Sequence, residues 1–223
     1  MNMVTVSLAG ERYDALASGA LWRPADRTLI VADLHLGKAE RRARQGYGLL
    51  PPYDTEDTLN RLDATVQEMR PRCLVMLGDS FDDLAIVSDL PGDAIDRICR
   101  LAAGRRVVWL SGNHDPAPVD LPGEHKDTLS SGACVFRHIA SADCGAEVSA
   151  HYHPKARFWL RGQSIVRPCF LIDRRRIILP AFGTYTGGLR IDDPLFDRLM
   201  EPDAIAVLTG RRAVAIPRAR AVV

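Results

Sequence analysis

Thr28-Leu29-Ile30-Val31-Ala32-Asp33-Leu34-His35 establishes the architecture, because a continuous apolar run ends in an aspartate and a histidine. The apolar runs Cys73–Leu77 and Val107–Leu110 end in a similar way, in Gly78-Asp79 and in Gly112-Asn113-His114-Asp115. Short uninterrupted apolar runs are typical of strands that are covered on both faces, as in parallel sheets. We therefore expect a parallel sheet whose carboxyl edge carries these polar residues.

Two helical patterns connect these strands. The first follows Asp54, which can cap a helix, and Pro71 stops it. Its apolar residues recur at helical spacing, at Leu59, Leu62, Val66 and Met69. The second is Pro91–Ala103, closed by Gly104, whereas Gly37–Tyr53 has the composition of a loop. This alternation of strands and helices predicts crossover helices that cover a parallel sheet.

The second half of the chain has a different pattern, with short strands separated by turns. We expect strands at Ala133–Arg137, Phe158–Leu160, Ser164–Arg167, Cys169–Ile172, Ile177–Leu179, Ala206–Leu208 and Val214–Ile216. They suggest antiparallel hairpins, with Asp173–Arg176 as one tip, and Val4–Leu8 is the first arm of an N-terminal hairpin. A parallel half and an antiparallel half predict an α/β protein with two sheets packed face to face and helices outside. We expect residues 1–223 to form a single domain.

The composition is that of a soluble cytoplasmic protein. It is 47% hydrophobic with a mean hydropathy of -0.07, and no apolar stretch could span a membrane. The N-terminus has no secretory pattern, and the 5 cysteines include no Cys-x-x-Cys pair, which argues against disulfides and a zinc–thiolate site. The net charge of +1 does not indicate a nucleic-acid binder.

The polar clusters have the chemistry of a two-metal hydrolytic site. Asp33 and His35 are two residues apart, as are His151 and His153, so on an extended strand each pair points to one side and can reach one ion. Asp79 and Asn113 add oxygen donors at the ends of neighbouring strands. A single cluster is weak evidence, since a lone histidine is more often structural, but four in this order are strong evidence. His125 lies in a polar, Pro/Gly-flanked stretch, where we expect a solvated loop residue.

The order Asp-x-His, Gly-Asp, Gly-Asn-His-Asp, His and His-x-His, over residues 29–153, resembles the calcineurin-like metallophosphoesterase superfamily. Three elements, Ala32–Lys38, Phe136-Arg137-His138 and Leu179–Gly188, resemble one bacterial branch, the ligase-associated DNA-damage-response endonucleases, or PdeM-type phosphodiesterases. With this tail the resemblance extends from about residue 4 to residue 191. It implies a calcineurin-like metallophosphoesterase fold, in which two mixed β-sheets form a sandwich flanked by helices, a four-layer αββα arrangement.

The resemblance also implies two divalent metal ions. One would be held by Asp33, His35, Asp79 and His153, and the other by Asp79, Asn113, His138 and His151. We expect Mn²⁺, with Fe, Zn or Mg as alternatives. The two ions would activate a bridging water to hydroxide for in-line attack on phosphorus. The superfamily usually has Gly where this chain has Ala150, so we expect a slight shift of His151.

Two catalytic residues follow from the same resemblance. His114 would protonate the leaving oxygen or steady its charge without binding metal. Asp115 would orient that imidazole or, as an equal alternative, cap a turn ahead of Pro116. Asp82 and Asp83 either support the metal ligands or are simply exposed.

The segments between the motifs leave no room for an inserted helical lid, and an open site suits a polymer. Arg41, Arg42 and Arg44 could line the approach and bind phosphates, or could equally be a solvated charge run. We therefore expect an endonuclease or phosphodiesterase that hydrolyses DNA in DNA repair, with a DNA ligase or helicase as a partner by family resemblance, and no membrane partner. The alternatives are a phosphatase or cyclic-nucleotide phosphodiesterase of small substrates, and a non-catalytic scaffold on the same fold.

Overall fold

The computed structural model describes residues 2–47, 50–142, 145–160 and 162–218. The first sheet has seven strands in the spatial order β1 to β7, with β1–β4 antiparallel and β4–β7 parallel. Its strands are β1 (Met3–Leu8), β2 (Glu11–Leu16), β3 (Leu21–Arg23), β4 (Thr28–Val31), β5 (Cys73–Met76), β6 (Arg106–Leu110) and β7 (Glu124–Lys126). The parallel sheet predicted from the three apolar runs is therefore confirmed, since these runs form β4, β5 and β6.

The second sheet has eight strands in the order β15-β14-β12-β13-β10-β9-β8, with β11 paired to β12. Its strands are β8 (Thr128–Ser131), β9 (Cys134–Arg137), β10 (Ala146–Ser149), β11 (Lys155–Leu160), β12 (Gln163–Ile172), β13 (Arg176–Ile178), β14 (Ile205–Leu208) and β15 (Val214–Pro217). The prediction of antiparallel hairpins throughout this half is wrong for β9, β10 and β13, which are parallel neighbours. Parallel neighbours start at the same end of the sheet, so the chain must cross back between them. A short hairpin turn cannot make this connection.

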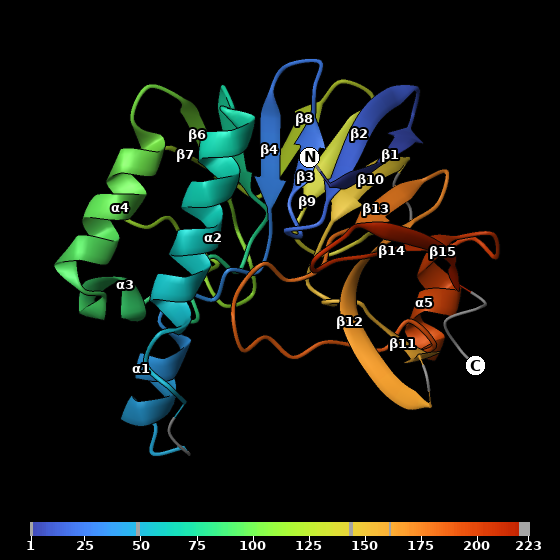
Figure 1. Ribbon diagram of the computed structural model, residues 1–223. Helices are drawn as coiled ribbons and strands as arrows, with labels where there is room; N and C mark the ends of the chain where they lie inside the picture. Colours follow the sequence, from blue (N-terminus) through green and yellow to red (C-terminus); the bar gives the residue numbers. More distant parts are fainter. Residues whose placement is uncertain (1, 48–49, 143–144, 161, 219–223) are drawn as a thin grey trace.

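The helices lie outside the two sheets (Figure 1). They are α1 (Lys38–Arg44), α2 (Asp54–Met69), α3 (Ile86–Asp89), α4 (Gly92–Ala102) and α5 (Pro194–Leu199). Helices α2 and α4 cover the first sheet and α5 covers the second, so the predicted αββα layering is confirmed. No helix in the described parts of the chain has the length and apolar character needed to cross a membrane.

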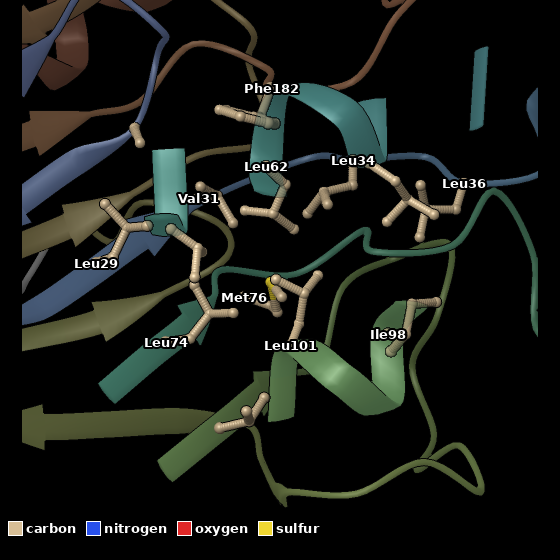
Figure 2. Close-up of a cluster of buried hydrophobic side chains, with 14 of the residues drawn as sticks. Leu29, Val31, Leu34, Leu36, Leu62, Leu74, Met76, Ile98, Leu101 and Phe182 are labelled. Atoms are coloured by element: carbon tan, nitrogen blue, oxygen red, sulfur yellow. The ribbon is translucent and has the colours of Figure 1, made fainter. Parts of the chain in front are cut away.

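Alternating side chains of the parallel strands fill two different cores. In β4, Leu29 and Val31 face the helices, whereas Ile30 faces the second sheet. Figure 2 shows the core under the helices, where Leu74 and Met76 of β5 pack beside Leu62 and Leu101 of the two covering helices. Since both faces of these strands are buried, their sequences are continuously apolar.

Two local predictions fail because of contacts between distant residues. The predicted loop Gly37–Tyr53 contains helix α1, whose Ala39 N–H donates to the Asp54 carboxylate at 3.1 Å. Asp54 is itself the first residue of α2, so it caps the neighbouring helix instead of its own. Ser164–Arg167 and Cys169–Ile172 form one strand, β12, which changes partners at Pro168. Residues 48–49 of the predicted loop lie outside the described residues.

No disulfide joins the described cysteines, and Cys144 lies outside the described residues. The turn predicted at Asp173–Arg176 is confirmed, because the Asp173 carboxylate accepts the N–H groups of Arg175 and Arg176. His125 is not a loop residue. It lies on β7, and its ring stacks on Trp109 with 6.4 Å between ring centroids.

Candidate metal centre

The predicted metal ligands follow the carboxyl ends of parallel strands in both sheets. The first sheet contributes the residues after β4, β5 and β6, and the second contributes those after β9 and β10. These residues are Asp33, His35, Asp79 and Asn113 from the first sheet, and His138, His151 and His153 from the second. The strand ends of the two sheets meet at one end of the sandwich, and the structure brings the seven side chains together there.

Asp33, His35 and His153 form the first donor group. Their potential ligand atoms all lie within 4.8 Å of one another. The Nε2 atom of His153 is 3.3 Å from Oδ1 of Asp33, and Nε2 of His35 is 3.9 Å from Oδ2 of Asp79. The geometry therefore agrees with a first cation site made from these residues and Asp79.

Asp79, His138 and His151 form the second donor group, again with potential ligand atoms within 4.8 Å. Nε2 of His138 lies 3.2 Å from Oδ2 of Asp79 and 3.1 Å from Oδ1 of Asn113. Nδ1 of the same ring lies 3.0 Å from the main-chain oxygen of Leu77, to which a proton on Nδ1 would be donated. This contact leaves Nε2 as the electron-pair donor toward the site. Asp79 thus borders both groups.

Unpaired buried atoms test whether the site suits metal ions. Oδ1 of Asp33, Nε2 of His35 and Nε2 of His153 are buried and have no hydrogen-bond partner among the described residues. Burying such groups unpaired is costly, so a native structure normally satisfies them. Divalent cations would satisfy all three, and imidazole and carboxylate donors suit Mn, Fe or Zn. The donor set therefore fits two divalent metal ions.

The backbone at the ligands differs from the extended strand that the Asp-x-His spacing implies. Asp33 and His35 have φ values of 51° and 46°, and His151 and His153 have φ values of 70° and 46°. Asp79 has a φ of 46°. Positive φ values are costly for non-glycine residues and cluster at functional sites. The side chains converge because the chain turns sharply after each strand, and the surrounding structure maintains this geometry.

Burial and charge act against each other at the pair of Asp79 and His138. Burial raises the pKa of Asp79, but the hydrogen bond and charge of His138 have the larger effect. The pKa of Asp79 is therefore lowered to about 2. Burial lowers the pKa of His138, but Asp79 and Asp33 raise it to about 9. A divalent cation bound to Nε2 of this histidine would compete with a proton at the same atom.

The family model for calcineurin-like phosphoesterases matches residues 26–179 of this chain. The chain belongs to the calcineurin-like phosphoesterase family. Comparison with curated proteins found no significant match. Among solved structures, the chain is similar to the Pseudomonas putida nuclease MPE, with a TM-score of 0.73, 28% identity, and coverage of 96% of this chain and 100% of that one. A weaker similarity is to Yfce, a phosphoesterase from E. coli, with a TM-score of 0.40, 10% identity and coverage of 85% and 98%.

In this phosphoesterase, His114 lies beside the two donor groups. Its backbone N–H donates to Oδ1 of Asp79 at 2.8 Å, and its ring is 4.8 Å from the His35 ring, centroid to centroid. Nδ1 of His114 is 2.8 Å from the main-chain oxygen of Asp82. The contact that orients this imidazole in the described structure therefore comes from Asp82.

Asp115 organises the loop that presents Asp79. Its carboxylate accepts the N–H groups of Asp79 at 3.0 Å, Ser80 at 2.7 Å, Phe81 at 3.2 Å and Gly112 at 3.0 Å. Burial raises the pKa of Asp115 to about 6. Only the Gly112 contact is local to the turn ahead of Pro116, whereas the other three join Asp115 to the loop after β5.

Gly112→Ala tests how closely these loops pack. A Cβ at Gly112 would lie 2.1 Å from Oδ1 of Asp79 and 2.2 Å from its backbone nitrogen, so Asp79 would have to move. We expect a loss of ~1–3 kcal/mol in unfolding free energy, as for other overpacked sites. We also expect Mn²⁺ to raise the Tm of Gly112→Ala by less than it raises the Tm of the unchanged protein. Gly92→Ala is the control, because its Cβ would meet nothing within 4 Å. An unchanged metal-induced rise in Tm for Gly112→Ala would contradict the prediction.

Asp82 is a residue whose role the sequence leaves open and the structure clarifies. It is only 1% exposed, and Oδ1 lies 3.0 Å from Nδ1 of His35. Lys38 Nζ lies 3.7 Å from the same oxygen, and Arg41 Nη1 lies 2.9 Å from Oδ2. Asp82 therefore supports His35 from behind, as carboxylates commonly do for metal-binding histidines. Asp83 is partly exposed and pairs with Arg41 and Arg44.

The three predicted phosphate-binding arginines lie on helix α1. Arg41 pairs with Asp82 and Asp83, and Arg44 pairs with Asp83 and Asp89. The guanidinium of Arg42 lies over the Tyr47 ring, 5.7 Å from its centroid. The run is therefore largely neutralised by neighbouring carboxylates, which the local sequence does not reveal.

The segment after β13 borders both ligand loops. A Cβ at Gly183 would lie 2.1 Å from the main-chain oxygen of Leu34, and one at Gly188 would lie 2.1 Å from the main-chain oxygen of His153. The N–H of Gly183 also donates to the main-chain oxygen of Asp33. The glycines of Leu179–Gly188 thus permit close backbone contact at the site. The sequence shows that these glycines cluster after a strand, but it does not indicate that they contact the ligand loops.

Proposed function

We propose that this protein is a Mn²⁺-dependent phosphodiesterase that cleaves DNA as an endonuclease. The observation that carries the proposal is the pair of donor groups at the carboxyl ends of the strands, with Asp79 belonging to one group and bordering the other. Two-metal sites of this kind are characteristic of phosphatases and nucleases. The similarity to the P. putida nuclease over nearly the whole chain supports nucleic acid as the substrate.

Each residue has a distinct role in this proposal. Asp33, His35, Asp79 and His153 would hold one ion, and Asp79, Asn113, His138 and His151 would hold the other. When bound, the two ions supply a nucleophilic water and neutralise charge on the phosphate. The main-chain oxygen of Asp82 lies 2.8 Å from Nδ1 of His114 and would fix the orientation of this imidazole. Nε2 of His114 would then deliver its proton to the leaving oxygen.

An open groove beside the second donor group supports a diester substrate. Its volume is about 300 Å³, and Asn113, His138, Arg137 and Ile139 are among the residues that line it. A phosphomonoester fills only one side of a metal pair, whereas a diester needs room for a second esterified group. The groove provides this room next to the proposed ligands Asn113 and His138.

The wider setting is also part of the proposal. By family resemblance, the enzyme would act in DNA repair in the cytoplasm, with a DNA ligase or helicase as a partner. We propose that residues 1–223 form one metallophosphoesterase domain. The core between the sheets supports this, because it contains residues of both.

Two assays test the proposed function. With Mn²⁺, hydrolysis of bis-p-nitrophenyl phosphate should exceed that of p-nitrophenyl phosphate, and the protein should nick single-stranded, nicked or duplex DNA. Preference for the monoester with no cleavage of DNA would favour the small-substrate phosphatase. No turnover of either ester would favour the scaffold.

Replacement of Arg41, Arg42 and Arg44 together by alanine tests the role of α1. Because Arg41 and Arg44 are paired with carboxylates, we expect the loss of about one phosphate contact, from Arg42. The slope of log K against log salt for DNA binding should then fall by ~0.7–0.9. A change equivalent to three contacts would mean that the ion pairs open when DNA binds. An unchanged slope would make the run a solvated surface.

A further inference from the structure

The hairpin of β11 and β12 begins two residues after the proposed ligand His153. It extends from the same end of the molecule as helix α1, on the opposite side (Figure 1). The β-strand register pairs Arg157 with Val166 and Trp159 with Ser164. A hairpin that leaves directly from a ligand loop is well placed to contact substrate outside the site.

The two faces of this hairpin differ. Ala156 is buried and Phe158 packs against the core under α5, so their face is turned inward. Arg157, Trp159, Ser164 and Val166 lie on the other face, because paired residues share a face and faces alternate along a strand. Trp159 is 61% exposed and Val166 is 45% exposed. We call the face formed by these four residues the open face.

Lys155 links the base of the open face to the segment that borders the metal centre. The side chain of Lys155, which precedes Arg157 on the same face, donates to the main-chain oxygen of Thr186 at 2.9 Å. Thr186 belongs to the segment whose Gly188 closely approaches His153. The open face is therefore continuous with the border of the proposed active site.

The charge of the hairpin matches a phosphate backbone. Residues 155–172 contain 4 cations and no aspartate or glutamate. Arg157 and Arg167 are exposed, and neither makes an ion pair with any described residue. Arg41 and Arg44 of α1, in contrast, are paired with carboxylates. An unpaired arginine next to an exposed tryptophan is the combination with which proteins bind single-stranded nucleic acid.

We propose that the open face binds an unpaired stretch of the DNA strand flanking the scissile phosphate. Arg157 contacts a backbone phosphate, and Trp159 stacks on a base. This inference rests on the proposed nuclease function. An extended chain places Arg157 at most ~14 Å and Trp159 at most ~20 Å beyond His153. At ~3.4 Å per stacked nucleotide, these positions lie within about four and six nucleotides of the cleaved bond.

The test measures how tightly fluorescein-labelled dT20 binds to the Mn²⁺-loaded His114→Ala protein, by fluorescence anisotropy. Trp159→Ala in this background should weaken binding about five-fold or more, and Trp159→Phe should recover most of the loss. Arg157→Ala should reduce the salt slope by ~0.7, and Arg157→Lys should restore it. Arg212→Ala is the matched control, because Arg212 is also exposed and has no ion pair among the described residues. It should bind like the parent protein.

A second measurement uses the variants with His114 intact. The ratio of kcat/KM on dT20 to that on bis-p-nitrophenyl phosphate should fall for Arg157→Ala and Trp159→Ala. For the parent protein, kcat/KM should rise with oligonucleotide length and reach its plateau by the time about six nucleotides flank the cut. Both hairpin variants should reach their plateau at shorter lengths.

The outcomes separate this inference from the proposed function. If the parent protein neither binds nor cleaves DNA, the nuclease proposal fails, and the inference fails with it. If the parent cleaves DNA, but the hairpin variants bind dT20 as tightly as the parent and show the same length dependence, only the inference fails. If Trp159→Ala weakened the binding of fully duplex DNA as much as that of dT20, the stacking role of Trp159 would be overturned. A dimer in sedimentation analysis that Trp159→Ala converts to a monomer would instead assign the open face to a second copy of this chain.

Discussion

Asp79→Asn should abolish tight binding of both metal ions and reduce turnover of bis-p-nitrophenyl phosphate by ~10³-fold or more. Asp79 is 2% exposed and lies next to ligand atoms of both donor groups, 3.2 Å from His138 and 3.9 Å from His35. The amide loses the negative charge and one metal-binding oxygen while its shape is nearly unchanged. Metal ions contribute several kcal/mol of transition-state stabilisation, and each 1.36 kcal/mol corresponds to a factor of ten.

Metal analysis and titration calorimetry with Mn²⁺ measure the first effect, and steady-state kinetics measure the second. Asp83→Asn is the control, since Asp83 is a partly exposed acid in the same loop that pairs with Arg41 and Arg44 and belongs to neither donor group. It should retain both ions. Two tightly bound Mn²⁺ ions in Asp79→Asn would show that this carboxylate does not bridge the sites.

His114→Ala should keep both metal ions but lose ~10²–10⁴-fold in turnover of substrates with a poor leaving group. The imidazole contacts the main-chain oxygen of Asp82 and lies beside the donor groups, so it is positioned to hold a proton there. A good leaving group such as p-nitrophenolate needs little protonation. The loss on bis-p-nitrophenyl phosphate should therefore be smaller than on DNA or an alkyl ester.

Kinetics on both ester classes, with the metal content of each protein, measure this difference. His125→Ala is the control, because that ring stacks on Trp109 and belongs to neither donor group. His35, Asp79 and His114 also offer ligand atoms within 4.8 Å of one another. Loss of one metal ion together with equal losses on good and poor leaving groups would therefore make His114 a ligand.

The sequence predicts the layers and the order of the ligand clusters because both depend on local patterns. Continuous apolar runs such as Thr28–Val31 identify buried strands, and polar residues after them identify the carboxyl edge. The convergence of Asp33 with His35 was predicted, but for a partly wrong reason. The two residues lie beyond β4 in left-handed backbone instead of on a pleated strand.

Features that depend on distant contacts could not be predicted in this way. Helix α1 is capped by Asp54, 15 residues away from Ala39, and Asp82 is buried where it packs against His35, Lys38 and Arg41. The pairing of Arg41 and Arg44 with aspartates of another loop changes a candidate phosphate-binding run into a mostly neutral helix. Each of these contacts joins segments whose proximity exists only in the folded chain.

The proposed ligands come from both sheets, so metal binding would also cross-link the sandwich. Asp33, His35 and Asp79 follow strands of the first sheet, whereas His138, His151 and His153 follow strands of the second. A ligand that binds only the folded state adds ~2.7 kcal/mol to its stability at a concentration one hundred times its Kd. The cohesion of the two sheets would then depend on the supply of divalent cations. Thermal resistance would record the metal loading of the protein even when no substrate is present.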